Sequence, residues 1–576
     1  MPKNKLSRLR VLSLVFLLVG GIFAVKLFFL QLVNGEEYRA KADGQYAKPR
    51  GETFTRGTIY FTARPTSGES AGNRRVSAAA LKDVYTLVIN PAKLGDHDET
   101  YDALTAITPI GYADFSLRAE KVGDPHEEIA TRLTAETAAA VRALKLPGVE
   151  LIEEKARFYP GGTLAAHLLG FVGYDEGAPS ELSGRYGLEK YYDDVLTRQD
   201  GPRFSSLLHQ IFLGESETSS GNEEAGDIVT TIEPTVERAL EDELSTISEL
   251  WRPAVTGGII MDPRTGEIIA MGALPNFDPG GKKFNIEHLT NPLVERVYEM
   301  GSIMKPLTMS AGLDAKVVTP ETTYYDRGSV ILGDREIWNY DRRGRGVVSM
   351  QEVLNQSLNT GAIYVMQQLG KDRLKKYFQD FGLLSEKTGI DLPGELNGLS
   401  GNLDNGREVE YATASFGQGI AVTPIAVTTA LSALANGGRL MRPFVVREID
   451  YEEKATVETK PLLRRQAVSE AAASTTTKML VQVVDKSILS GRERLAHYQV
   501  AAKTGTAQIR NPAGGYYTDR YLHSFFGYFP ASNPRFSVFL YTVEPQGAQY
   551  ASETLAKPFF NLAKFLLNYY QIPPDR

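Results

Sequence analysis

The chain contains no cysteine among its 576 residues. Disulfide bonds, thiolate nucleophiles, iron–sulfur clusters and cysteine-based zinc sites are therefore excluded. The seven histidines are scattered, with no HExxH motif and no close pair, so no histidine metal site is indicated. A basic excess is also missing, because 63 lysines and arginines stand against 70 aspartates and glutamates. This balance argues against a protein that mainly binds nucleic acid.

Only one apolar run has the length of a membrane span, and it lies near the N-terminus. Residues 11–33 read VLSLVFLLVGGIFAVKLFFLQLV, and they follow four basic residues, Lys3, Lys5, Arg8 and Arg10. The positive flank predicts a cytoplasmic N-terminus, with the chain from residue 34 onward outside the cytoplasm. A cleaved signal peptide is the competing interpretation. The apolar run resumes after Lys26, which favours an uncleaved anchor.

Large apolar side chains are missing from residues 214–226, GESETSSGNEEAG, which is typical of a linker or an exposed loop. A chain of this length is expected to hold several domains. The sequence therefore predicts four parts: a cytoplasmic tail at 1–10, a transmembrane anchor at 11–33, a mixed α/β region at 34–220 and a C-terminal domain at 221–576.

The C-terminal domain shows strand patterns on both sides of a helical region. Turn chemistry at residues 262–266, DPRTG, joins two β-rich runs and predicts a hairpin. The predicted elements are a strand at 227–232, a helix at 234–250, strands at 257–261 and 267–271, helices from about 302 to 440, strands at 498–502, 524–529 and 536–542, and a helix at 556–569. This order predicts an α+β fold with one sheet assembled from distant segments.

Ser302 and Lys305 lie three residues apart in a segment with a helical pattern. Positions i and i+3 share a face of a helix, so the Lys305 amine should reach the Ser302 hydroxyl. A serine hydroxyl is a poor nucleophile until a neighbouring base takes its proton. A lysine acts as that base only when desolvation or a nearby cation keeps its amine neutral. The pair predicts nucleophilic catalysis, and an exposed polar helix face is the alternative explanation of this spacing.

Two further motifs offer groups to the same chemistry. Ser357-Leu358-Asn359 supplies a hydroxyl for proton relay and an amide for holding Lys305 or a substrate. Lys503-Thr504-Gly505-Thr506 follows an apolar run. On an edge strand it would present backbone groups to an extended substrate, and a positive charge and two hydroxyls to a carboxylate. Gly505 would let the substrate approach closely.

A second Lys-Thr-Gly stands at residues 387–389. It follows a helical run and leads into Asp391-Leu392-Pro393-Gly394-Glu395, a polar loop with a proline. An interior or edge strand is not expected there. The sequence therefore assigns the active site to the copy at residues 503–505.

With these three motifs in order, the chain resembles the penicillin-binding proteins and serine β-lactamases. Residues 50–545 resemble class B penicillin-binding proteins most, and especially the septal, division-type subgroup. The matching runs are YEMGSIMKPLT at 298–308, GIIMDPRTGEIIAMGALPNFDP at 258–279, FGLLSEKTGIDLPGE at 381–395, ATASFGQGIAVTPIAVTTALSALANGG at 412–438 and AAKTGTAQ at 501–508, and, upstream, RGTI at 56–59, ARFYPGGTLAAHLLGFVG at 156–173 and GLEKYYDDVLT at 187–197.

This resemblance implies a penicillin-binding-protein transpeptidase fold, an antiparallel sheet with a helical subdomain, at 221–576, and a non-catalytic pedestal or dimerisation-type domain at 34–220. It implies a penicillin-sensitive serine D,D-transpeptidase that cross-links peptidoglycan stem peptides and needs no cofactor or metal. The implied catalytic residues are Ser302, Lys305, Ser357, Asn359 and Lys503, with substrate binding by Thr504, Gly505 and Thr506. The implied partners are stem peptides, β-lactams, a multi-span membrane glycosyltransferase and other cell-wall synthesis proteins.

Other functions remain as alternatives. An elongation-type class B transpeptidase would share every motif. A membrane-anchored β-lactamase would need an efficient deacylating base, and a β-lactam sensor would be expected to carry a signalling domain. A catalytically silent division scaffold is the non-enzyme alternative, against which the intact Ser302, Lys305 and Lys503 argue.

Overall fold

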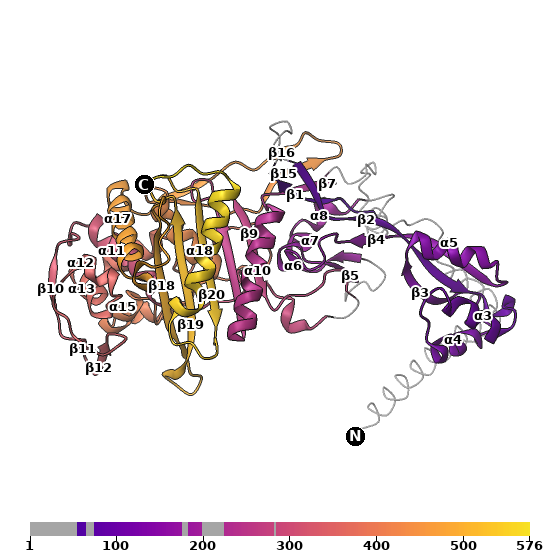
Figure 1. Ribbon diagram of the computed structural model, residues 1–576, viewed down its shortest axis with the longest axis horizontal. Coiled ribbons are helices and arrows are strands. Elements are labelled where there is room, and N and C mark those ends of the chain that lie inside the picture. The colour runs from indigo at the N-terminus through magenta and orange to yellow at the C-terminus, as the bar shows by residue number, and fades with distance from the viewer. Residues whose placement is uncertain (1–54, 65–73, 175–181, 199–223, 282–283) are drawn as a thin grey trace, which may run out of the picture. The chain divides into compact units, whose positions relative to one another are not determined.

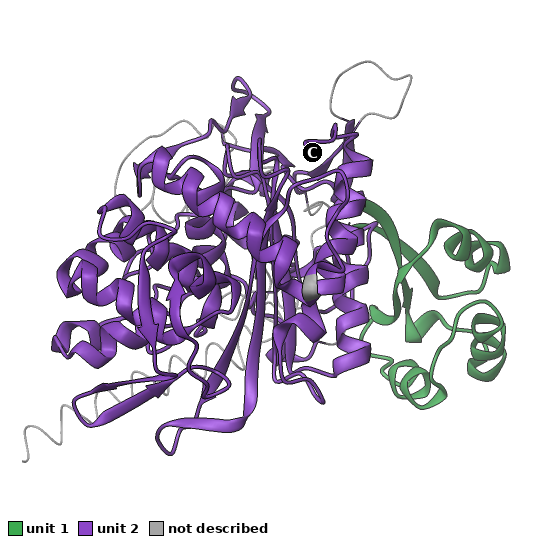
Figure 2. Cartoon of the chain, turned by 60° about the vertical axis from the view of Figure 1, so that its left-hand side comes forward, with its two compact units in different colours: residues 1–54, 82–156 green, residues 55–81, 157–576 purple. Residues whose placement is uncertain are grey.

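The structure, a computed structural model, describes residues 55–64, 74–174, 182–198, 224–281 and 284–576 (Figure 1). They form two compact units, one of residues 82–156 and one of residues 55–81 and 157–576 (Figure 2). The predicted tail and anchor, at 1–10 and 11–33, lie outside the described residues, as does the predicted boundary near residue 220. Within the described residues, no helix combines the length and the apolar character that a membrane span requires.

The unit of residues 82–156 has a small core of its own. Leu87 and Ile89 of one strand, Leu133 of the next strand, and Leu104 and Phe115 of two helices are buried together. Apolar side chains on one face of each element explain this packing. Its elements are the C-terminal part of β2 (Arg74–Ile89), α3 (His97–Thr105), α4 (Tyr112–Ala119), β3 (Glu127–Leu133), α5 (Ala135–Leu144) and most of β4 (Val149–Phe158).

The larger unit is organised around a five-stranded antiparallel sheet, in the order β18-β19-β20-β8-β9. The predicted hairpin is confirmed, since β8 pairs with β9 through the turn at 262–266. The predicted union of distant segments is also confirmed, because β20 pairs with β8. Strand β18 lies at the edge of the sheet. The five strands are β8 (Val255–Met261), β9 (Ile268–Leu274), β18 (Ala501–Arg510), β19 (Tyr516–Phe529) and β20 (Phe536–Val543).

Helices cover both faces of this sheet. Successive side chains of β19 point to opposite faces, so their contacts show which helix lies on each face. Phe525 stacks on Phe559 of α18 (Ala551–Tyr569), which lies beside α10 (Pro234–Trp251) on that face. Tyr528 faces the other way and hydrogen bonds to Thr477 of α17 (Glu470–Lys486). Helix α11 (Lys305–Asp314) packs against α17 and belongs to the helical part of the unit (Figure 1).

The helical part surrounds the second motif and carries short two-stranded sheets. Its elements are η4 (Gly301–Met304), β10 (Thr323–Asp326), β11 (Ser329–Leu332), β12 (Arg335–Trp338), β13 (Gly346–Ser349), α12 (Met350–Asn355), α13 (Asn359–Leu369), α14 (Lys371–Asp380), η5 (Gly401–Asn405), α15 (Glu408–Ala414), α16 (Pro424–Ala435), β14 (Arg439–Met441), β17 (Leu463–Gln466) and η6 (Ile488–Gly491). The short turn η3 (Ile286–His288) lies elsewhere, with the carbonyl of His288 2.9 Å from Nε2 of His167.

Residues 55–81 and 157–198 contribute a second sheet and a buried ion cluster to the larger unit. Strand β1 lies between β7 and β2, and the paired order continues through β15 to β16. Glu189 is fully buried and accepts from Arg56 Nε and Arg157 Nε, each at 2.6 Å. The cluster joins three of the runs singled out in the sequence. The elements of this part are β1 (Ile59–Ala63), α6 (Ala166–Leu169), β5 (Val172–Tyr174), β6 (Leu182–Gly184), α7 (Gly187–Tyr191), α8 (Asp193–Leu196), β7 (Gly226–Thr230), β15 (Val446–Tyr451) and β16 (Val457–Glu458). The remaining short turn, η2 (Pro91–Lys93), belongs to the unit of residues 82–156.

Candidate active site

Ser302 lies in the 3-10 turn η4, which leads directly into α11 at Lys305. In a 3-10 turn, residues i and i+3 are eclipsed, so the lysine stands directly above the serine. The turn begins at Gly301, whose φ is +63°, and a Cβ on this residue would lie 3.0 Å from the backbone of Thr506. Glycine is therefore needed at 301 both for the backbone conformation and for close contact with strand β18.

Lys305 is buried, and its amine lies within hydrogen-bond distance of Ser302 in the first motif and of Ser357 in the second. Its Nζ lies 3.0 Å from Ser302 Oγ, 2.5 Å from the Ser357 carbonyl and 3.2 Å from Ser357 Oγ. Burial, together with the nearby charge of Lys503, holds the pKa of Lys305 well below its usual value. A neutral amine is the form that can accept the proton of Ser302.

Ser357 lies between the two lysines. The Nζ of Lys503 donates to Ser357 Oγ at 3.0 Å and to the carbonyl of Thr504 at 3.0 Å. Burial lowers the pKa of Lys503 to about 7. Ser357 itself has a φ of +54°, a left-handed conformation that is costly for a residue with a Cβ. Strained backbone of this kind clusters at functional sites.

The side chains of Lys503-Thr504-Gly505-Thr506 divide between the cavity and the sheet. Lys503, Thr504 and Thr506 line the cavity that also contains Ser302. Gly505 faces the protein instead, and a Cβ there would lie 2.7 Å from the Met300 carbonyl. The close approach that this glycine permits is thus to the turn before Ser302. The oxygen Oγ1 of Thr506 accepts from the backbone N–H of Ala551 at 3.1 Å, which leaves its proton available to a ligand.

Asn359 begins helix α13 and lines the cavity, but its amide does not point at Lys305. Its Nδ2 donates to the carbonyl of Trp338 at 2.9 Å. Asn359 therefore connects helix α13 to the end of β12. Its oxygen Oδ1 is the part of the amide that remains for a substrate or a neighbour.

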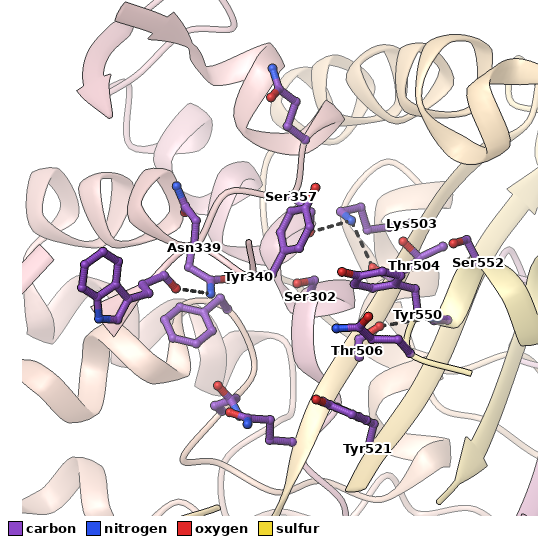
Figure 3. A pocket seen from close by; sticks show the side chains of 18 of the residues that line it. Ser302, Asn339, Tyr340, Ser357, Lys503, Thr504, Thr506, Tyr521, Tyr550 and Ser552 are labelled. Carbon is purple, nitrogen blue, oxygen red and sulfur yellow. Dashed lines mark hydrogen bonds between the residues drawn. The ribbon is translucent and has the colours of Figure 1, made fainter. Parts of the chain in front are cut away.

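The cavity has a volume of about 890 Å³ and lies between the edge of the sheet and the helical part of the unit (Figure 3). Aromatic and amide side chains that the motifs did not indicate also line it. Tyr340 and Tyr550, from opposite walls, have ring centroids 6.0 Å apart. Phe416 and Gln418 fall in a run with family resemblance, whereas Trp338, Tyr340 and Tyr550 had no signal in the sequence.

The second Lys-Thr-Gly lies in a loop away from this cavity, as the sequence predicted. Thr388 donates its backbone N–H and its hydroxyl to Glu395, each at 2.6 Å, and Lys387 is exposed. These contacts stabilise a turn. Among the described residues, no group of three or more histidines, aspartates or glutamates is close enough together to hold a metal ion.

Comparison with known proteins places the two parts of the chain in families. Residues 256–563 match the model of the penicillin binding protein transpeptidase domain, and residues 75–211 match the penicillin-binding protein dimerisation domain. Stage V sporulation protein D of Bacillus subtilis is 30% identical over 95% of this chain and 83% of its own length. A probable peptidoglycan D,D-transpeptidase FtsI of Caulobacter vibrioides is 31% identical over 80% of this chain and 73% of its own.

Solved structures agree with these matches. Penicillin binding protein 3 of Mycobacterium tuberculosis, in its apo form, is 27% identical and superposes with a TM-score of 0.64, covering 73% of this chain and 92% of that one. Penicillin Binding Protein 2X of Streptococcus thermophilus is 21% identical, with a TM-score of 0.71 over 90% of this chain and 79% of that one, which supports the fold alone.

Proposed function

This chain belongs to the class B penicillin-binding proteins, and from that premise we propose that Ser302 is the residue through which it cross-links peptidoglycan stem peptides. It is a peptidoglycan D,D-transpeptidase of the septal type. The observation that supports the assignment to Ser302 is the 3.0 Å contact of its Oγ with the buried amine of Lys305. A neutral lysine at this distance is the base that a serine nucleophile requires.

In the acylation step, Ser302 Oγ attacks the carbonyl carbon of the penultimate D-alanine of a donor peptide. The Ser302 proton passes to Lys305, and the carbonyl oxygen becomes an oxyanion facing the backbone N–H groups of Ser302 and Thr506. When the carbon–nitrogen bond breaks, the amine of the terminal D-alanine takes a proton from Lys305, relayed by Ser357. The contacts of Lys305 with both serines support this route.

The carboxylate of the terminal D-alanine binds to Lys503, Thr504 and Thr506. All three line the cavity, and the available proton of Thr506 suits a carboxylate oxygen. A bound carboxylate raises the pKa of Lys503, because an opposite charge favours the charged form of an amine. Substrate binding would therefore charge Lys503 and leave Lys305 neutral.

In the second step, an amine of a neighbouring stem peptide attacks the acyl-enzyme and forms the cross-link, with its proton returning through Lys305 to Ser302. Hydrolysis is the competing outcome, and a β-lactamase needs a base that activates water. Glu336 is the only acidic side chain among the described residues that line the cavity, and its carboxylate accepts from Ser329 at 2.7 Å on an exposed hairpin. This arrangement favours a transpeptidase over a β-lactamase.

The domain that contains Ser302 is expected to be acylated by β-lactams, and the penicillin binding protein 3 of Mycobacterium tuberculosis has been solved in complexes with aztreonam and ampicillin. Residues 11–33 would anchor the chain in the cytoplasmic membrane as a single span, with residues 1–10 inside and the catalytic domain outside. Residues 34–220 would act as a pedestal that docks partners, among them a multi-span glycosyltransferase.

Intact-mass analysis after brief exposure to benzylpenicillin tests the proposal. The wild-type chain should keep a persistent adduct, and Ser302→Ala should show none. The matched control is Ser310→Ala, a buried serine of the following helix α11 whose hydroxyl donates to the Leu307 carbonyl. It should be acylated like the wild type. Hydrolysed drug without an adduct would identify a β-lactamase, and intact drug without an adduct would favour a silent scaffold.

A further inference from the structure

The hydroxyl of Ser524 is completely buried beneath the active site. Ser524 lies on β19, directly opposite Gly505 of β18. Its Oγ donates to the carbonyl of Met300 at 2.8 Å and lies 3.4 Å from the carbonyl of Gly505. One side chain therefore touches both the turn that leads to Ser302 and the strand that carries Thr506.

The turn and the strand meet backbone to backbone at this point. A Cβ on Gly505 would lie 2.3 Å from Ser524 Oγ, 2.7 Å from the Met300 carbonyl and 3.0 Å from the backbone nitrogen of Ile303. Contacts this close leave no room for a side chain at 505. The Ser524 hydroxyl therefore links the turn before Ser302 to strand β18 by hydrogen bonding, at a place where their backbones are already in close contact.

Strand β19 also binds the segment before Ser302 at a second point. At the N-terminal end of β19, Tyr516 donates its hydroxyl to the carboxylate of Glu299, with distances of 2.9 and 3.1 Å to the two oxygens. Glu299 and Met300 immediately precede the turn that contains Ser302. Strand β19, which contains none of the three motifs, thus anchors the entry to the nucleophile.

We propose that Ser524 is a positioning residue that sets the separation of the two oxyanion-hole donors, the backbone N–H groups of Ser302 and Thr506. This role rests on the proposed function. One donor belongs to the turn and the other to the strand, and Ser524 fastens the turn to the sheet beside that strand. Such donors must be held to within about 0.5 Å of the developing oxyanion to stabilise it.

The proposal separates two steps of the reaction with a β-lactam. Ser524 does not line the cavity, and it is not among the groups that bind the carboxylate. Loss of its hydroxyl should leave the dissociation constant of the non-covalent complex within about twofold of the wild type. The acylation rate constant should fall by about 10- to 100-fold, because a displacement of about 1 Å in a catalytic site has effects of this size.

The experiment compares Ser524→Ala with Ser537→Ala in saturation kinetics of acylation by a chromogenic cephalosporin. Ser537 is the matched control: it is fully buried on the neighbouring strand β20, and its hydroxyl has no hydrogen-bond partner among the described residues. The control should acylate like the wild type. Ser524→Cys keeps the shape of the side chain, with a larger sulfur atom and a weaker donor, and it should acylate at an intermediate rate.

The outcomes distinguish this inference from the proposed function. If the wild type is not acylated, the proposed function fails. If the wild type is acylated and Ser524→Ala matches Ser537→Ala, or changes only the dissociation constant, the positioning role is wrong. If neither Ser524 variant gives folded protein by circular dichroism, Ser524 serves folding and the positioning role is again overturned.

Discussion

The amine of Lys503 lies 3.0 Å from the hydroxyl oxygen of Ser357. The same hydroxyl is 3.2 Å from the amine of Lys305, so one serine stands between two buried lysines. Two charged amines so close together in a dry site would repel each other strongly. The arrangement therefore favours a neutral Lys305, which suits a base, and leaves the charge to Lys503, which faces the carboxylate of the substrate.

Lys305→Arg should slow acylation strongly. A guanidinium stays protonated at any accessible pH, so it cannot accept the proton of Ser302. The acylation rate constant should fall by about 10²- to 10⁴-fold, the usual contribution of a general base. The measurement is adduct formation with benzylpenicillin by intact mass. Lys376→Arg, an exposed lysine of α14 paired with Asp380, is the matched control and should react normally.

The acylation rate of the wild type should also depend on pH in one direction. Protonation of Lys305 removes the base, so the rate should fall as pH decreases through the lowered pKa of this amine. A rate that stays flat from neutral pH down to the limit of stability, or that rises in acid, would contradict a neutral Lys305 as the base.

The variants Ser357→Gly and Ser357→Ala should distinguish the backbone strain at residue 357 from the role of its hydroxyl in acylation. Both variants lose the hydroxyl that links the two lysines, so both should acylate at least about tenfold more slowly than the wild type. Glycine adopts the observed φ of +54° without cost, whereas alanine keeps a penalty of about 1 kcal/mol or more. Thermal unfolding should therefore show a higher midpoint for the glycine variant. Equal midpoints would mean that no strain is stored at this residue.

The two Lys-Thr-Gly copies allow the same lysine-to-alanine substitution to be compared inside and outside the cavity. Lys503→Ala removes an amine that touches Ser357 and lines the cavity, and it should reduce acylation by about 10²-fold or more. Lys387→Ala removes an exposed amine in the loop after α14 and should leave acylation unchanged. Second-order acylation rate constants for the two variants check this. A loss of activity in Lys387→Ala would mean that the second copy has a role in the reaction.

Two buried glutamates predict a pH-dependent stability. Burial and the charge of Glu241 raise the pKa of Glu237 to about 8, and burial raises that of Glu241 to about 7. Between about 4.5 and about 8, the folded chain thus holds protons that the unfolded chain has lost, so stability falls as pH rises through this window. Glu237→Gln should reduce the drop in melting temperature across this window by at least about 2 °C. Glu249→Gln, an exposed carboxylate of the same helix, should keep the wild-type drop.

Local pattern was enough to predict most elements of the larger unit. The helix expected at 234–250 is α10, Pro234–Trp251, and the hairpin expected at 257–271 is β8 and β9. The strands around the third motif were placed only in part. The strand predicted at 498–502 overlaps β18 only at residues 501–502, and the strand predicted at 524–529 is the C-terminal part of the longer β19. Polar side chains that line the cavity, from Lys503 onward, break the apolar alternation by which a strand is recognised.

Orientation was harder to predict than location. The sequence indicated that Asn359 and Gly505 belong to the site, but Asn359 donates to Trp338 and Gly505 faces Met300 and Ser524. Ser524, Trp338 and Tyr550 carry no local signal at all. Their positions depend on which strand pairs with which, and on how loops from distant segments meet over the cavity.

The sequence by itself determined the reacting groups and their order, because Ser302 and Lys305 are juxtaposed by a single turn of chain, whatever surrounds it. Only the tertiary structure decided whether those groups react. It brings Ser357 to Lys305 across 52 residues and Lys503 to Ser357 across 146, and it removes both amines from water. Desolvation and the pairing of distant segments set the lowered pKa values and the distances.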